Sequence, residues 1–215
     1  MSHLEGVREH YEQALRSTGD SGRRVGWRDT TAQTTRFGSF LKLMTGYSLG
    51  SVADIGCGTA DFLSFLRFEG WAEHYVGVDI SPSMIEEATE RFRLDTCSQF
   101  LITESLPRAY FLIASGIFNV SLQTAPSVWK AYCEETIIMM WQSAQQGIMF
   151  NMLSIDSEPE RRQRHLTYFD PSDWLRFVRE HLSACVRLDQ TYGQFDFSIA
   201  VFRSASSTSQ RDIEV

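Results

Sequence analysis

The sequence predicts an α/β domain: a three-layer sandwich on a mostly parallel seven-stranded sheet with an antiparallel last strand, preceded by an N-terminal helical cap. Between residues 49 and 203, short apolar runs alternate with helical segments, and runs such as VGVD, FLIA and IMFNML are apolar on both sides of the pleat. Strands buried on both faces are typical of parallel sheets covered by helices. The last run, FDFSIAVF, alternates apolar and polar residues instead, which favours an antiparallel strand. In such a sheet, ligands bind outside the carboxyl ends of the strands.

The individual elements can be placed from apolar runs and helix-start signals. We expect strands near residues 51–55, 75–79, 99–103, 110–115 and 147–153, then two more around a turn at Gly193. Ser81 can cap a helix that begins at Pro82, and Asp170 with Pro171 repeats this arrangement. Apolar residues also recur at helical spacing from Leu4 to Leu15 and from Trp27 to Met44. We therefore divide the chain into a helical cap (1–48), a ligand-binding domain (49–203) and a disordered polar tail (204–215).

Composition narrows the class of protein. A chain of 215 residues with 43% hydrophobic content suits a single core, and its formal net charge of −7 argues against a nucleic-acid partner. The four cysteines form no CxxC pair and have no nearby His, so neither a metal site nor a disulfide framework is indicated. No apolar run has the length of a membrane span or the character of an export signal. We expect a cytoplasmic protein without a metal or a membrane partner.

A glycine-rich loop, DIGCGTA at residues 54–60, follows the first predicted strand. It lacks the Lys-Ser or Lys-Thr of a phosphate-binding P-loop, and Asp61 stands where a dinucleotide-binding loop has its third glycine. Gly56 and Gly58 would let a ligand approach the backbone, while the carboxylate of Asp54 favours an ammonium or a sulfonium over a pyrophosphate. The loop is thus predicted to hold a cationic cofactor.

Polar residues also end the next three predicted strands. Asp79 can accept hydrogen bonds from both hydroxyls of a ribose, and Glu104 could meet an adenine amino group. Ser115 and Asn119 follow the fourth strand at the same edge. The alternatives remain open: Asp79 could cap the helix at Pro82, and Glu104 could be a solvated loop residue.

DIGCGTA, VGVDISPSMIEEA and FLIASGIFNV together resemble the motif series of class I S-adenosylmethionine-dependent methyltransferases, over roughly residues 50–203. The resemblance implies a Rossmann-like fold and S-adenosyl-L-methionine as cofactor, with S-adenosyl-L-homocysteine as product. It assigns the methionine half to Asp54, Gly56, Cys57, Gly58 and Ala60, the ribose to Asp79, the adenine to Ile80, Met84 and Glu104, and the surroundings of the sulfonium to Ser115. Ala60 departs from the family's usual glycine by one methyl group, and Met84 could instead belong to the helix core.

The catalytic residues stay unknown at this point. Methyl transfer needs the acceptor held in line with the S–CH₃ bond, and a base only if the acceptor keeps its proton. Residues at the predicted rim are candidates for the acceptor side: Asn119, His165, Tyr168 and Tyr11. Arg36 could pair with the methionine carboxylate. Asn119 could equally be a turn cap, and His165 and Arg36 ordinary surface residues.

The acceptor itself is predicted from what the chain lacks. The loop SGIFN has no Asn-Pro-Pro-Tyr signature of enzymes that methylate nucleobases or glutamine, and the short covers leave little surface for a macromolecule. We expect methyl transfer to O or N of a small metabolite, in a biosynthetic role, by a monomer or homodimer. The alternatives are a catalytically silent cofactor-binding subunit and, ranked last, an aminopropyl transferase.

Overall fold

A computed structural model describes residues 2–16, 30–71, 73–103, 105–193 and 195–204. Its centre is one seven-stranded sheet with the order β3-β2-β1-β4-β5-β7-β6. The strands are β1 (Val52–Ile55), β2 (Tyr75–Val78), β3 (Ser98–Leu101), β4 (Ala109–Ala114), β5 (Ala144–Leu153), β6 (Val186–Asp189) and β7 (Asp196–Phe202). The first five pair in parallel, whereas β7 is antiparallel to both of its neighbours. The predicted sheet and its antiparallel last strand are confirmed.

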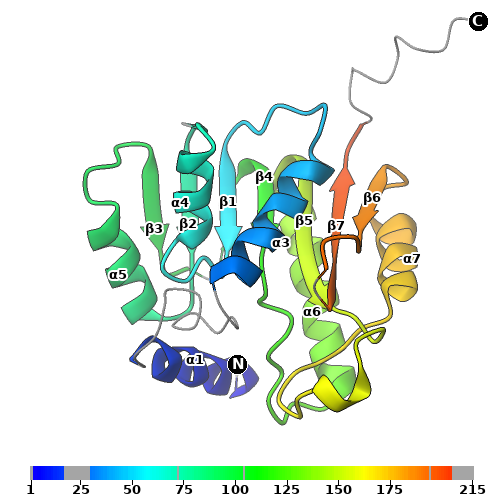
Figure 1. Ribbon diagram of the computed structural model, residues 1–215. Coiled ribbons are helices and arrows are strands. Elements are labelled where there is room, and N and C mark those ends of the chain that lie inside the picture. The colour runs from blue at the N-terminus through cyan, green and yellow to red at the C-terminus, as the bar shows by residue number, and fades with distance from the viewer. Residues whose placement is uncertain (1, 17–29, 72, 104, 194, 205–215) are drawn as a thin grey trace, which may run out of the picture.

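Helices cover both faces of this sheet (Figure 1). They are α1 (Ser2–Leu15), α3 (Thr30–Leu43), α4 (Asp61–Phe68), α5 (Pro82–Arg91), α6 (Pro126–Ser143) and α7 (Pro171–His181), with a 3₁₀ turn at Pro159–Arg161. One apolar core joins α3, α4 and α5 to one face, and a second joins α6 and α7 to the other. The result is the predicted three-layer sandwich.

Two helix starts follow the predicted capping chemistry. The Ser81 hydroxyl accepts from the Met84 amide at 3.4 Å, and Pro82 occupies the first turn, where no amide donor is needed. The Asp170 carboxylate accepts from the Ser172 amide at 2.8 Å in front of α7. Because each helix begins directly after a strand or loop at the carboxyl edge, these caps also shape the rim of the site.

The two N-terminal helices occupy different places. α1 lies across the carboxyl ends of the parallel strands, as expected for a cap (Figure 1). α3 instead packs against β6, β7 and α4, with Phe37 and Phe40 buried in the core. The expectation that both helices roof the edge is therefore corrected: the apolar stripe of α3 belongs to the sheet face. Trp27 and the tail from residue 205 onward lie outside the described residues.

The connection between β3 and β4 is short. Residues 102–108 join the two parallel strands without a helix in the described part of this segment. The sheet face beside α6 is consequently less covered at this end: Gln99 is exposed, and Leu101 and Val76 are only partly buried.

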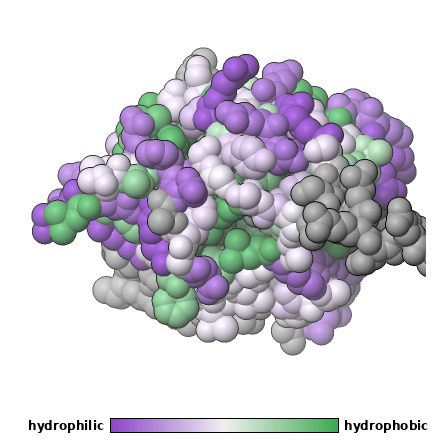
Figure 2. Space-filling model, turned by 90° about the horizontal axis from the view of Figure 1, so that it is seen from above, coloured by the Kyte–Doolittle hydropathy of each residue, from purple (hydrophilic) through white to green (hydrophobic). Residues whose placement is uncertain are grey.

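The surface at the amino ends of the strands carries both polar and apolar residues. Seen from above in Figure 2, at the amino ends of the parallel strands, the face is mainly hydrophilic, with apolar residues gathered near its centre. None of the helices in the described ranges is long and apolar enough to cross a membrane. Cys57, Cys97, Cys133 and Cys185 are all free thiols.

Candidate cofactor and acceptor site

The glycine-rich loop turns sharply between β1 and α4. Gly56 and Gly58 have φ values of 73° and 54°, in the left-handed region that favours glycine. The amides of Gly56 and Cys57 donate to the Val78 carbonyl at 2.7 and 3.0 Å, which ties the loop to the end of β2. A Cβ on Gly56 would lie 2.1 Å from Cγ2 of Ile117. Gly56 is thus required by its conformation and by close contact with the loop after β4.

Ala60 ends the loop and precedes α4. It is fully buried and also left-handed, with φ 61° and ψ 41°. A non-glycine residue in this region costs about 1–2 kcal/mol. The sequence reveals only the added methyl group of Ala60. The larger free-energy cost is conformational, because Ala60 adopts the same left-handed backbone as Gly56 and Gly58.

Asp79 stands at the tip of β2, facing this loop. Its two carboxylate oxygens accept from the amides of Gly58 at 2.9 Å and Ser81 at 2.8 Å. Burial raises the pKa of Asp79, and the hydrogen bonds from the Ser81 and Gly58 amides oppose this rise. The carboxylate therefore joins the glycine loop to the start of α5. Asp79 thus supports the Ser81 cap without being the cap itself, and the residue as a whole is only partly buried.

Asp54 lies one strand away, on β1, and is buried. Its carboxylate accepts from the Tyr75 hydroxyl at 2.5 Å. Burial raises the pKa of Asp54 to about 7; the hydrogen bond from Tyr75 opposes this, and the charge of Asp79 adds to it. A positive ligand group near this pair of carboxylates would be stabilised, as the sequence predicted for the loop.

Asn151 holds the loop after β4 and was missed by the sequence analysis. It is fully buried on β5, and its side-chain oxygen accepts from the Gly116 amide at 2.7 Å. Its amide nitrogen lies 3.5 Å from the Ser115 hydroxyl. The signal was present as a lone amide within the apolar run IMFNML. Asn151 thereby fixes Ser115, the residue predicted to lie beside the sulfonium.

The residues predicted around the adenine differ in accessibility. Ile80 exposes 42% of its surface at the start of α5, where a ring could cover it. Met84 exposes only 2%, so the structure favours its alternative role in the helix core. Glu104 lies outside the described residues.

Arg36 does not reach the edge as a free cation. Its guanidinium forms a buried ion pair with Asp196 at the start of β7 and donates to the Ala32 carbonyl at 2.7 Å. The charge of Arg36 opposes the burial that raises the pKa of Asp196. This arrangement assigns Arg36 a structural role between α3 and the sheet, and its predicted pairing with a methionine carboxylate has no support in these contacts.

Two acceptor-side candidates are engaged within their loops. The Asn119 side-chain oxygen accepts from the Leu153 amide at 3.1 Å, and its carbonyl accepts from Thr167 at 2.8 Å. Tyr168 accepts through its hydroxyl from the Gln163 amide at 3.0 Å. Asn119 therefore joins the loop after β4 to β5 and to the segment before α7, in agreement with its structural alternative.

α1 brings the other two candidates together at the carboxyl edge. The rings of His10 and His165 are 5.6 Å apart, and Glu12 lies 3.3 Å from the Ser81 hydroxyl. Burial, followed by the charge of Asp79, raises the pKa of Tyr11. Burial and then the neighbouring His165 lower the pKa of His10. His165 and Tyr11 thus line one rim, with His10 as an addition that the sequence analysis did not single out.

A polar network supports the loop from behind. Arg91 of α5 bonds to Asp61 at 2.5 Å and to the Thr59 carbonyl at 3.0 Å, and Gln33 of α3 bonds to Asp61 at 3.2 Å. Asp61, which excluded a dinucleotide loop in the sequence, is thus a buried anchor for α4. These contacts could not be predicted from the spacing of residues in the sequence motifs, because they join segments that are distant in the chain.

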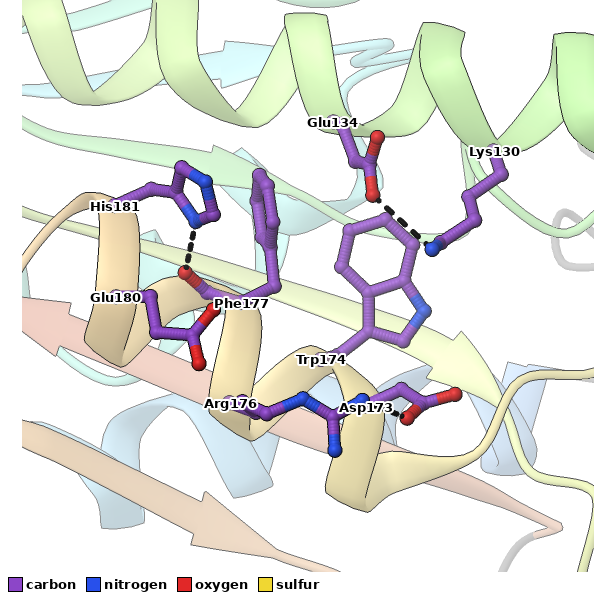
Figure 3. A pocket seen from close by; sticks show the side chains of 8 residues that line it. All are labelled: Lys130, Glu134, Asp173, Trp174, Arg176, Phe177, Glu180 and His181. Carbon is purple, nitrogen blue, oxygen red and sulfur yellow. Dashed lines mark hydrogen bonds and ion pairs between the residues drawn. The ribbon is translucent and has the colours of Figure 1, made fainter.

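A hollow on the outer surface, between α6 and α7, is a poor candidate for the site (Figure 3). Its volume is about 170 Å³, and four of its charged groups are already paired: Lys130 with Glu134 at 3.4 Å and Arg176 with Asp173 at 2.5 Å. It also lies away from the glycine loop. Among the described residues, no cluster of His, Cys, Asp and Glu could hold a metal ion.

Together, the sheet order, the left-handed glycine loop after β1 and the carboxylate at the tip of β2 define a Rossmann-like domain of the methyltransferase type. Residues 52–125 match the family model described as a methyltransferase domain. The chain is 34% identical over 157 residues to the Mycobacterium tuberculosis protein named "Putative methyltransferase Rv1506c", covering 73% of this chain and 94% of that protein. The chain therefore belongs to the class I S-adenosylmethionine-dependent methyltransferases.

Solved structures share the fold at low sequence identity. The N-methyltransferase NodS from Bradyrhizobium japonicum, in complex with SAH, is 14% identical with a TM-score of 0.64; the match covers 91% of this chain and 97% of that one. The magnesium protoporphyrin IX methyltransferase ChlM from Synechocystis, with bound SAH, is 14% identical with a TM-score of 0.60 and coverages of 94% and 97%. At this identity the likeness supports the fold alone.

Proposed function

We propose that this methyltransferase transfers the methyl group of S-adenosylmethionine to an oxygen or nitrogen of a small-molecule metabolite by in-line displacement. The observation that carries the cofactor assignment is the Asp79 carboxylate, held by the Gly58 and Ser81 amides at 2.9 and 2.8 Å. These contacts hold the Asp79 carboxylate beside the glycine loop, which supports its proposed role as the acceptor for the ribose hydroxyls. A cytoplasmic location belongs to the same proposal.

The donor set suits this cofactor. Asp54 and Asp79 favour the ammonium and sulfonium charges, while Gly58 leaves the backbone open for a close approach. The cofactor supplies an activated methyl group whose carbon bonds to the acceptor as the S–C bond breaks and its electron pair stays on sulfur. The protein's part is to orient the two partners, which alone can contribute on the order of 7–11 kcal/mol.

The acceptor side of the proposal rests on charge and neighbouring groups. The net charge of −7 disfavours a nucleic-acid acceptor. At the rim, the imidazole of His10 lies beside His165 and could receive a proton from an alcohol or ammonium acceptor. A proton carried by His10 would leave to water once the product departs.

Calorimetry with S-adenosylhomocysteine tests the cofactor assignment. Asp79→Ala removes the acceptor for two ribose hydroxyls, each worth about 1.5–3 kcal/mol to a charged partner, so we expect binding to weaken about a hundredfold or more. Asp95→Ala is the matched control, because Asp95 also accepts from a backbone amide, that of Cys97, but lies away from the loop and pairs with Arg67. Equal affinity in wild type and Asp79→Ala would refute the ribose assignment, and no binding by wild type would refute the cofactor proposal.

A further inference from the structure

A hollow of about 350 Å³ lies along the first turns of α6, on the side turned away from α7. It is lined by Ser127, Val128, Ala131, Tyr132 and Glu135, which share one helix face at spacings of three and four. Val128 leaves 50% of its surface exposed, and Met139, about three turns further along the same helix, leaves 44%. An exposed apolar stripe next to a hollow is unusual for a helix that covers a sheet.

The short β3–β4 connection explains why this helix face is open. α6 packs against β4 and β5 and is not flanked by a helix from residues 102–108 in the described part of that connection. On the same side of the sheet, Gln99 of β3 is exposed. The hollow is thus a consequence of topology rather than of a local packing fault.

Tyr132 connects the hollow to the carboxyl edge. Its ring lies 5.0 Å from Trp129 and 6.5 Å from Phe118, whose segment follows β4. Burial raises the pKa of Tyr132 to about 12, with the charge of Asp79 as a smaller contribution. The charge of Asp79 also adds to the burial that raises the pKa of Tyr11 on α1. Tyr132 therefore lies between the hollow and the loop after β4, in which the neighbouring Ile117 packs against Gly56 of the glycine loop.

Approach from directly above the strand ends is restricted by α1. Its Gly6 is so close to Leu122 that a Cβ there would lie 3.3 Å from that side chain, and Glu12 reaches Ser81 on the other side of the edge. α1 therefore spans from the loop after β4 to the start of α5. A side entrance along α6 avoids this helix.

We propose that the hollow on α6 is the acceptor-binding site, and that it takes a small apolar or aromatic molecule carrying a hydroxyl or amine. The apolar body would lie against Val128 and Ala131, with its nucleophile directed past Tyr132 toward the cofactor edge. Its volume falls at the lower end of the range for small-ligand pockets, which suits one or two rings. Glu135 at the rim favours neutral or cationic molecules over anionic ones. This inference rests on the proposed function and adds the chemical class and the route of the acceptor.

The neutral fluorescent probe N-phenyl-1-naphthylamine, added to the full chain, tests the hollow. We expect saturable binding to wild type, displaced by p-cresol, and at least tenfold weaker binding to Ala131→Trp, whose side chain fills the space. Lys130→Trp is the control, because Lys130 is exposed on the neighbouring face of α6 toward α7. It should bind the probe like wild type.

Calorimetry with S-adenosylhomocysteine on the same three proteins separates this inference from the proposed function. Unchanged cofactor affinity in Ala131→Trp, together with lost probe binding, supports an acceptor site distinct from the cofactor loop. Two results would overturn the inference while the proposed function stands, provided that wild type binds S-adenosylhomocysteine. One is that Ala131→Trp binds the probe as tightly as wild type does. The other is that wild type does not bind the probe saturably. If wild type fails to bind S-adenosylhomocysteine, both are overturned.

Discussion

Replacing Asn151 by Leu should weaken both the fold and the cofactor site. Leucine has the same number of side-chain heavy atoms and the same branching as asparagine, but it removes the acceptor 2.7 Å from the Gly116 amide, which is itself buried. An unsatisfied buried amide costs about 1–3 kcal/mol. For a domain of this size, 1 kcal/mol corresponds to about 2–4 °C, so the melting temperature should fall by about 2–12 °C. Because the same side chain contacts Ser115, cofactor binding should weaken as well.

Urea unfolding and calorimetry with S-adenosylhomocysteine measure the two effects. Met149→Leu is the matched control, since Met149 is also fully buried on β5 and such a swap usually costs less than about 1.5 kcal/mol. Asn151→Asp keeps an acceptor and should retain more of the loop's order at low pH, where a buried carboxyl stays protonated. Should Asn151→Leu match Met149→Leu in both stability and affinity, the positioning role of Asn151 would be wrong.

Two further predictions concern buried carboxylates. The pKa of Asp54 is raised by burial from 3.8 to about 7, so the folded protein holds this proton more tightly; the group's contribution to stability is lost as pH rises from about 4 to about 7. A cationic ligand favours the ionised form of Asp54, so S-adenosylmethionine should bind about tenfold more weakly at pH 6 than at pH 8 in calorimetric titrations. Asp54→Asn should remove this pH dependence. If the dependence persists in that variant, Asp54 is not its source. Arg36→Met should destabilise the fold by about 3–5 kcal/mol in urea unfolding, because it leaves Asp196 buried without its cation. Adding Asp196→Asn should recover much of that loss, whereas additive losses would argue against coupling of the pair.

The strands were predictable because burial on both faces leaves a direct mark on the sequence. VGVD and FLIA lie in β2 and β4, and the alternating final run forms β7. Helix starts were predictable for the same local reason, since Ser81 and Asp170 cap the helices that follow them. Local chemistry thus accounts for most of the element assignments.

The missed features depend on contacts between distant segments. Arg36 and Asp196 are separated by 160 positions, and only the packing of α3 on β7 brings them together. Asn151 had a local signal, but its partner on the loop after β4 was not readable from the strand itself. The left-handed backbone of Ala60 was hidden because alanine rarely adopts it, so its sequence identity suggested only a small change in volume.

The position of β7 also constrains how the chain can fold. β7 is inserted between β5 and β6, pairing with β5 from Gly147 to Leu153 and with β6 from Val186 to Asp189. During synthesis, β5 therefore keeps an unpaired edge, and β6 has no neighbour in the sheet until residues 196–202 have emerged. The sheet can be completed only after residues 196–202 have been synthesised, so premature termination before Asp196 would leave an aggregation-prone edge.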